Sequence, residues 1–127
     1  RKALTDEWGK RGVKEGLEFA ILTNEITQAW TGLTTKQYKN LKGLKKENLR
    51  DYMTNLELVL NMLAETATTE ISEKSEPKNF EQNQQVAREG GTVAGNARKE
   101  IEAKTGRKVI SAANFKSAKK KSLPNSE

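Results

Sequence analysis

The chain contains no histidine and no cysteine. The first absence removes the side chain that most often acts as a general base or metal ligand near neutral pH. The second excludes disulfide bonds, thiolate metal centres and cysteine nucleophiles. The composition therefore argues against most kinds of enzyme, and we expect a protein that works by binding, with no catalytic residues.

Apolar residues are also scarce, at 34% of a chain of 127 residues. A chain of this length buries roughly two-thirds of its unfolded surface, which is enough for one modest core. The apolar stretch 56–64 is interrupted by Glu57 and Asn61, and it is shorter than the roughly 20 residues of a membrane span. We expect a soluble protein, and because the first residue is Arg1 rather than methionine, a piece of a longer polypeptide.

Charge is unevenly distributed, although the net charge is only +6. Residues 1–50 carry 11 basic and 6 acidic side chains, residues 51–89 carry 3 and 8, residues 90–106 carry 3 and 2, and residues 107–127 carry 6 and 1. A basic beginning, an acidic middle and a basic end are compatible with pairing between helices and equally with binding of a charged partner.

Prolines are rare, since only Pro77 and Pro124 occur, and apolar residues recur at intervals of three and four. This spacing is typical of helices with one buried face. We therefore expect an all-α fold, a compact array of about five to six helices. The predicted helices cover residues 5–12, 14–30, 34–41, 48–53, 55–72 and 79–105.

Two capping boxes support these boundaries. Thr34 precedes Gln37 by three residues, and Thr54 precedes Glu57 by the same interval. At this spacing the threonine and the longer side chain each bond a free backbone amide at the start of a helix. The second box predicts a bend near Thr54, although one straight helix over residues 48–72 remains an alternative.

The last part of the chain is less regular. A linker is expected at 74–78, and residues 107–111 form the only strand-like run, predicted as a short extended segment that would need a pairing partner. Residues 116–127 contain Lys119–Lys121 beside serine and proline, a composition typical of a flexible tail. The prediction is one helical domain over 1–115 followed by a basic tail over 116–127.

Small residues recur every four positions in the predicted last helix, at Ala87, Gly91 and Gly95. One face of that helix would lack bulk, so that a neighbouring helix could approach closely. The neighbour could belong to this chain or to a second copy in a homodimer, and a break at Gly90-Gly91 is a third alternative. A phosphate loop is not expected, because the glycines follow a helix and lack the Gly-Lys-Ser/Thr ending.

No metal or cofactor site is expected. The acidic residues Glu15, Glu18 and Glu25 lie beside Lys14 and lack the glycines of a cation-binding loop. No other arrangement of residues resembles a catalytic or cofactor site, so we expect neither a cofactor nor a small-molecule substrate.

The strongest candidate for binding is a run of basic residues in the first half of the chain. If a helix resumes soon after Gly43, four cations fall along one edge: Lys39, Lys42, Lys46 and Arg50. Lysines that follow phosphates, with Tyr38 or Tyr52 for a base to stack on, would suit single-stranded nucleic acid. The alternative is that these lysines are only the solvated outer side of a helix.

Three separated blocks of the sequence, in the same order, resemble the C-terminal portion of the DNA-damage-inducible protein D family. They are Leu41–Asp51, Arg88–Arg98 and Thr105–Ser111, and the similarity extends from about Arg1 to Phe115. Members of that family resemble phage antirepressors in carrying an N-terminal Bro-type domain, which would lie upstream of Arg1.

The resemblance implies a bacterial, cytoplasmic protein of the SOS response that acts on the recombination apparatus at single-stranded DNA without catalysing a reaction. The expected partners are single-stranded DNA, the recombinase filament on it, or both, and no membrane. The alternative is an oligomerisation module for the absent N-terminal DNA-binding domain. The resemblance supplies no site residues, so the predicted site depends on the charge and spacing described above.

Overall fold

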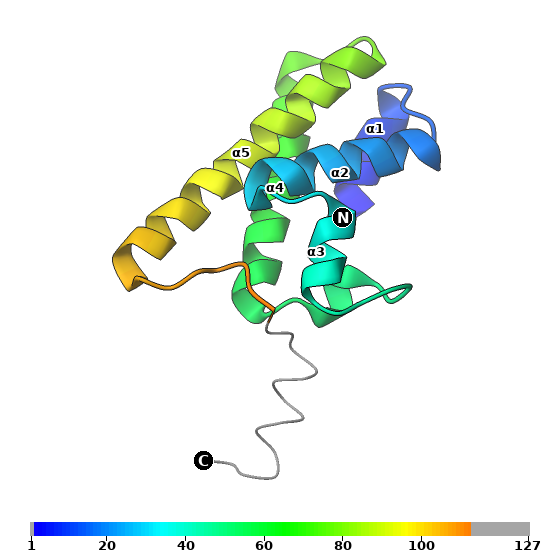
Figure 1. Ribbon diagram of the computed structural model, residues 1–127. Helices are drawn as coiled ribbons and strands as arrows, with labels where there is room; N and C mark the ends of the chain where they lie inside the picture. The colour runs from blue at the N-terminus through cyan, green and yellow to red at the C-terminus, as the bar shows by residue number, and fades with distance from the viewer. Residues whose placement is uncertain (1, 113–127) are drawn as a thin grey trace.

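The structure is a computed structural model that describes residues 2–112, and within that range all regular secondary structure is helical (Figure 1). The all-α prediction is therefore confirmed. The elements are α1 (Lys2–Lys10), α2 (Leu17–Thr31), α3 (Thr35–Leu41), the 3-10 helix η1 (Leu49–Tyr52), α4 (Asn55–Ser75) and α5 (Phe80–Thr105).

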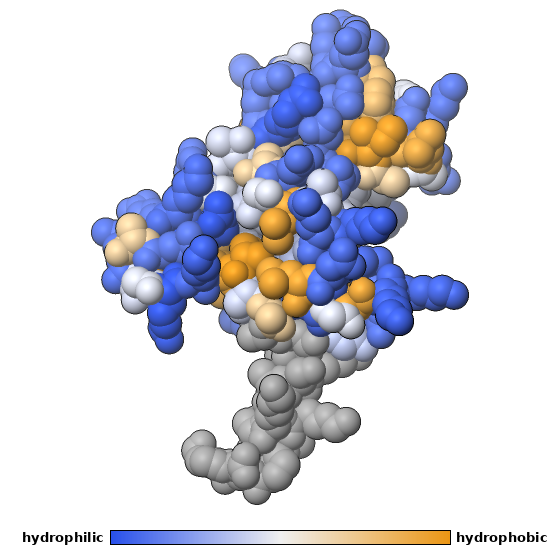
Figure 2. Space-filling model, viewed as in Figure 1, coloured by the Kyte–Doolittle hydropathy of each residue, from blue (hydrophilic) through white to orange (hydrophobic). Residues whose placement is uncertain are grey.

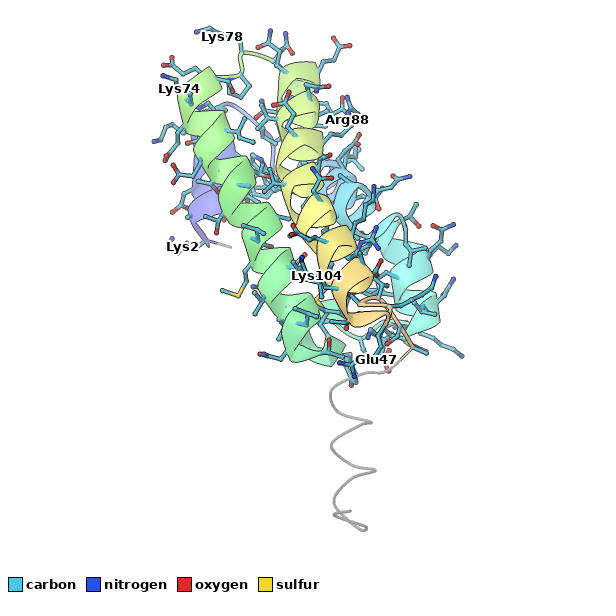
Figure 3. The ribbon with its side chains drawn as sticks, turned by 90° about the vertical axis from the view of Figure 1, so that its left-hand side faces the viewer. Lys2, Glu47, Lys74, Lys78, Arg88 and Lys104 are labelled. Carbon is cyan, nitrogen blue, oxygen red and sulfur yellow. The ribbon has the colours of Figure 1, made fainter. Side chains whose placement is uncertain are left out.

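The two longest helices, α4 and α5, form an antiparallel pair around which the shorter helices pack. Figure 3 shows them side by side, with Lys74 and Lys78 near the connecting turn and Lys104 and Glu47 toward the opposite end. Helix α1 packs on α4, and α2 lies mainly against α5. The core between these helices contains Leu4, Trp8, Leu22, Ile26, Trp30, Tyr38, Leu60, Ala64, Ala87 and Ala94.

Close approach to α5 depends on its small residues. A Cβ atom at Gly90 would overlap Thr68 of α4, and one at Gly91 would lie 2.7 Å from the carbonyl oxygen of Ile26 in α2. At Gly95 the same atom would lie 2.8 Å from the carbonyl oxygen of Ala29. The helix is continuous through Gly90-Gly91, so the alternative of a break there is wrong.

The stripe of small residues predicted in α5 is consequently occupied within the chain. Gly91 and Gly95 lie against α2, and Ala87 is fully buried. Because α2 fills this face, these positions are not open to a second copy, and the dimer seam proposed from their spacing is not the arrangement found.

Both predicted capping boxes are present. The Thr34 hydroxyl accepts from the Gln37 backbone N–H, and the Gln37 side chain accepts from the Thr34 N–H. Thr54 and Glu57 make the same reciprocal pair at the start of α4. The chain is extended at Met53, between η1 and α4, so the alternative of one straight helix over 48–72 is wrong.

Two predicted helix starts differ from the structure. Helix α1 begins at Lys2, so Thr5 is inside it, and its hydroxyl donates to the Lys2 carbonyl at 3.1 Å. Helix α2 begins at Leu17 rather than Lys14, because Gly16 has a φ of 85°, which interrupts a right-handed helix.

Residues 107–111 are not a strand. The Val109 side chain is buried, and its N–H donates to the Glu102 carboxylate at 3.0 Å, so the segment is held against α5 without a pairing strand. Arg98 of α5 bonds the other Glu102 oxygen and also donates to the Trp30 carbonyl at the end of α2. The predicted tail 116–127 lies outside the described residues. From residue 2 to residue 112, no helix combines the length and apolar character needed to cross a bilayer.

Candidate functional site

The predicted basic edge is not formed, because α3 ends at Leu41 and the chain makes a loop instead of resuming a helix. Gly43 has a φ of 75°, and residues 43–48 precede the short helix η1. The four predicted cations are consequently separated. They are Lys39 in α3, the buried Lys42, Lys46 in the exposed loop and Arg50 in η1.

Lys42 is a structural residue and not a surface contact for DNA. Its Nζ lies 2.6 Å from Glu57 Oε1, and both side chains are completely buried. The Tyr38 hydroxyl donates to the other Glu57 oxygen at 2.7 Å. Burial and the neighbouring Glu57 charge raise the pKa of Tyr38 well above its ordinary value, so the phenol stays protonated and keeps donating. The prediction that Lys42 contacts nucleic acid is wrong, because a salt bridge within the core holds its charge.

Arg50 begins a chain of polar contacts that runs from the surface to the core. Its Nη1 lies 3.2 Å from Glu65, and 32% of its side chain remains exposed. Glu65 accepts from Asn61 Nδ2 at 3.4 Å, and Asn61 Oδ1 accepts from the Trp30 indole N–H at 3.3 Å. These contacts fix the orientation of the Asn61 amide, because each end of it has a partner.

A cavity of about 320 Å³ opens between α2, α3, η1 and α4. Its polar lining comes from all four elements and from Asn48, which precedes η1; the residues in the elements are Thr23, Thr27, Thr35, Lys39, Arg50 and Asn61. The fold thus brings together two of the four predicted cations, Lys39 and Arg50, at one cavity. Sequence reasoning missed the threonines, for which the signal was the spacing of four between Thr23 and Thr27 in a mostly apolar helix.

Four lysines lie on α3 and on the loop that follows it. We call Lys36, Lys39, Lys45 and Lys46 the basic surface; Lys39 is half-buried and the others are exposed. Figure 2 shows hydrophilic side chains over α3 and the loop that follows it. Backbone N–H groups of Lys45 and Lys46 donate to Glu47 and lower the pKa of its carboxyl, so Glu47 is ionised and offsets one positive charge.

Two of the three acidic residues considered for a metal site make other contacts. Glu18 accepts from the Lys14 backbone N–H at 2.9 Å, and Glu25 pairs with Arg88 of α5 at 3.3 Å. In the part of the chain that the structure describes, no three acidic side chains are grouped closely enough to hold a metal ion.

Comparison with known proteins gives one match. The family model described as the DinD C-terminal domain matches residues 1–116. Searches of curated proteins and of solved structures found no match. The family match agrees with the resemblance drawn from the three sequence blocks, whereas the relation to antirepressors stays a prediction.

Proposed function

The chain belongs to the DinD C-terminal domain family, a family of DNA-damage-inducible proteins, and we propose that it acts in the damage response by binding single-stranded DNA or the recombinase filament on it. The proposal places this activity in the bacterial cytoplasm. It includes no catalytic step, because a chain without histidine or cysteine has few groups suited to acid–base or nucleophilic chemistry.

The observation that supports the proposal best is the basic surface around α3 and the loop 43–48. Among residues 2–112, no carboxylate forms an ion pair with the side chains of Lys36, Lys39, Lys45 or Lys46. These ammonium groups are therefore available to phosphates. Lysine contacts to phosphates release condensed counterions, and this release drives binding without regard to base sequence.

The test is a salt series of binding to a fluorescent single-stranded oligonucleotide, followed by anisotropy. Four phosphate contacts give a slope of about −3 for log affinity against log salt, at about −0.7 per phosphate on a single strand. Changing both Lys45→Gln and Lys46→Gln should flatten the slope by about 1.4. Helicity should not change, because both residues lie in a loop.

A matched control removes the same charge elsewhere. Lys74 and Lys78 are exposed. They lie at the opposite end of the α4–α5 pair from Glu47, a residue of the loop 43–48 whose carboxylate accepts a hydrogen bond from the Lys45 N–H (Figure 3). The variant with Lys74→Gln and Lys78→Gln should keep the parent slope. Equal weakening by both pairs would mean that net charge alone drives binding and that the basic surface has no special role.

Binding to the recombinase filament needs a separate measurement, because the filament consists of protein as well as single-stranded DNA. Co-sedimentation with recombinase filaments on single-stranded DNA should retain the chain in the pellet. If the chain binds neither DNA at near-physiological salt nor the filament, the proposed function is refuted.

A second candidate is an oligomerisation or protein-interaction module for an N-terminal DNA-binding domain of antirepressor type. It is favoured by an exposed apolar stripe on α4, formed by Leu56, Val59, Met62 and Leu63, with exposures of 38%, 52%, 52% and 37%. Neighbouring apolar side chains on one exposed face are typical of interaction surfaces. Sedimentation velocity over a concentration series should then reveal a dimer that Val59→Lys dissociates.

A further inference from the structure

The cavity between α2, α3, η1 and α4 is not needed for phosphate contacts made by exposed lysines. Its volume of about 320 Å³ falls within the usual range for ligand pockets, roughly 300–1,000 Å³. The lining also includes the apolar side chains of Leu49 and Met53 and the amide of Asn48. The lining therefore combines mainly polar side chains with two apolar ones, a mixture that can contact both the edge and the face of a flat polar ring.

The Asn61 amide in the lining has a hydrogen-bond partner at each end. It is 8% exposed, with its oxygen bonded to Trp30 and its nitrogen to Glu65. An amide has two N–H donors and two lone pairs, so one donor and one acceptor remain after these bonds. An adjacent donor and acceptor match the hydrogen-bonding edge of a nucleobase, as in pairing of Asn with adenine.

The same cavity is bordered by two cations. Lys39 and Arg50 both line it, and Arg50 contacts Glu65 through Nη1, leaving other guanidinium N–H groups for a second anion. The lining thus combines hydroxyl and amide groups, apolar side chains and two cations. This combination suits a base joined to a phosphate.

We propose that this cavity binds one nucleotide, with the base near Thr27, Leu49 and Asn61 and the phosphate at Lys39 and Arg50. The inference rests on the proposed binding of single-stranded DNA and adds that the protein reads a base as well as phosphates. An unpaired strand can turn one base into a cavity at little cost, whereas a duplex must first break a pair and its stacking. A free mononucleotide also consists of a base joined to a phosphate, so it is the other ligand that the experiment must distinguish.

The experiment compares two fluorescent single-stranded oligonucleotides of equal length and charge, one of deoxyadenosines and one of abasic sugar-phosphate units. Binding to the full chain is followed by anisotropy at one salt concentration. A base seated in the cavity should favour the intact strand roughly 5- to 150-fold, which corresponds to the 1–3 kcal/mol of one bidentate contact between an amide and a base edge. Phosphate contacts alone would give equal affinities.

Two variants assign the preference to the cavity. Thr27→Val keeps the shape of a buried side chain and removes its hydroxyl, so it should reduce the preference for the intact strand several-fold and leave abasic binding unchanged. Lys39→Gln should weaken binding of both strands equally. Thr92→Val, an exposed position on α5, is the matched control and should change neither. Thermal unfolding of each variant shows whether the fold is retained.

The outcomes separate the cavity from the proposed function. Equal binding of both strands by the parent refutes the base-binding cavity and leaves DNA binding in place. If neither strand binds but deoxyadenosine monophosphate does, and Thr27→Val abolishes that binding, the cavity stands and the proposed binding of single-stranded DNA fails. If neither strand nor the mononucleotide binds, the cavity and the proposed binding of single-stranded DNA are both refuted.

Discussion

Gly91 allows the packing of α5 to be tested with a single methyl group. In a helix interior, Gly→Ala gains up to about 1 kcal/mol of helix propensity, so propensity alone predicts stabilisation. At Gly91, however, the added Cβ would lie 2.6 Å from the Ala29 Cβ and 2.7 Å from the Ile26 carbonyl oxygen. A backbone oxygen cannot rotate away, so α2 and α5 must separate, and overpacking of this kind costs about 1–3 kcal/mol. Because both contacts are shorter than 3.0 Å, we take the upper part of this range, about 2–3 kcal/mol, and after subtracting the propensity gain we expect Gly91→Ala to destabilise by about 1–2 kcal/mol net.

Urea unfolding followed by circular dichroism measures this loss. With a slope of about 1–3 kcal/mol per M, the midpoint should fall by roughly 0.5–1 M. Gly9→Ala is the control, because Gly9 is also helical and a Cβ added there would meet no atom within 4 Å; that variant should be neutral or more stable. If Gly91→Ala is more stable than the parent by the roughly 1 kcal/mol that helix propensity alone gives, close packing is not the reason for glycine at this position.

Three further predictions concern stability. Lys42→Met leaves the Glu57 carboxylate buried without its cation and should cost about 3–5 kcal/mol in thermal or urea unfolding, and adding Glu57→Met should recover part of the loss. Thr54→Ala removes the cap of α4 and should cost about 0.5–2 kcal/mol, whereas Thr54→Ser should be close to the parent; equal stability of the two variants would contradict the capping role. The hydrogen bond from the Val109 N–H is the largest influence holding the pKa of Glu102 below its ordinary value of 4.5. The stabilisation from this hydrogen bond is therefore complete above pH 4.5, the ordinary pKa of Glu102, and is lost as pH falls through the lower pKa of the folded state. In unfolding measured at a series of acidic pH values, the stability difference between the parent and Glu102→Gln should shrink toward zero; a constant difference would refute this account.

Features set by nearest neighbours along the chain could be predicted from the sequence. The capping boxes at Thr34 and Thr54 need only a partner three residues away, and both are formed. The glycines that end α2 and α5, Gly32 and Gly106, adopt the left-handed conformation that stops a helix. Gly16 also has a positive φ, but it precedes α2 instead of ending a helix, and the apolar pattern around it predicts an earlier start for α2.

The site required contacts between distant segments, and these could not be read from local patterns. Lys42 stands among other lysines and looks like part of a solvated face, but its partner Glu57 is 15 residues away on another helix. The cavity likewise combines Thr27, Arg50 and Asn61 from three elements. No local sequence pattern shows that these residues are neighbours, because they come together only in the packed fold.

The position of α5 also determines when this domain can fold during synthesis. Helices α2 and α4 leave the ribosome before α5, yet both pack mainly on α5 and only weakly on each other. At roughly 5–20 residues per second, the 26 residues of α5 take about 1–5 s to synthesise. Throughout that interval the faces of α2 and α4 that α5 will cover remain exposed to chaperones and proteases. Slower translation across α5 would lengthen that exposure, so we expect synonymous codon changes within α5 to alter the yield of folded protein.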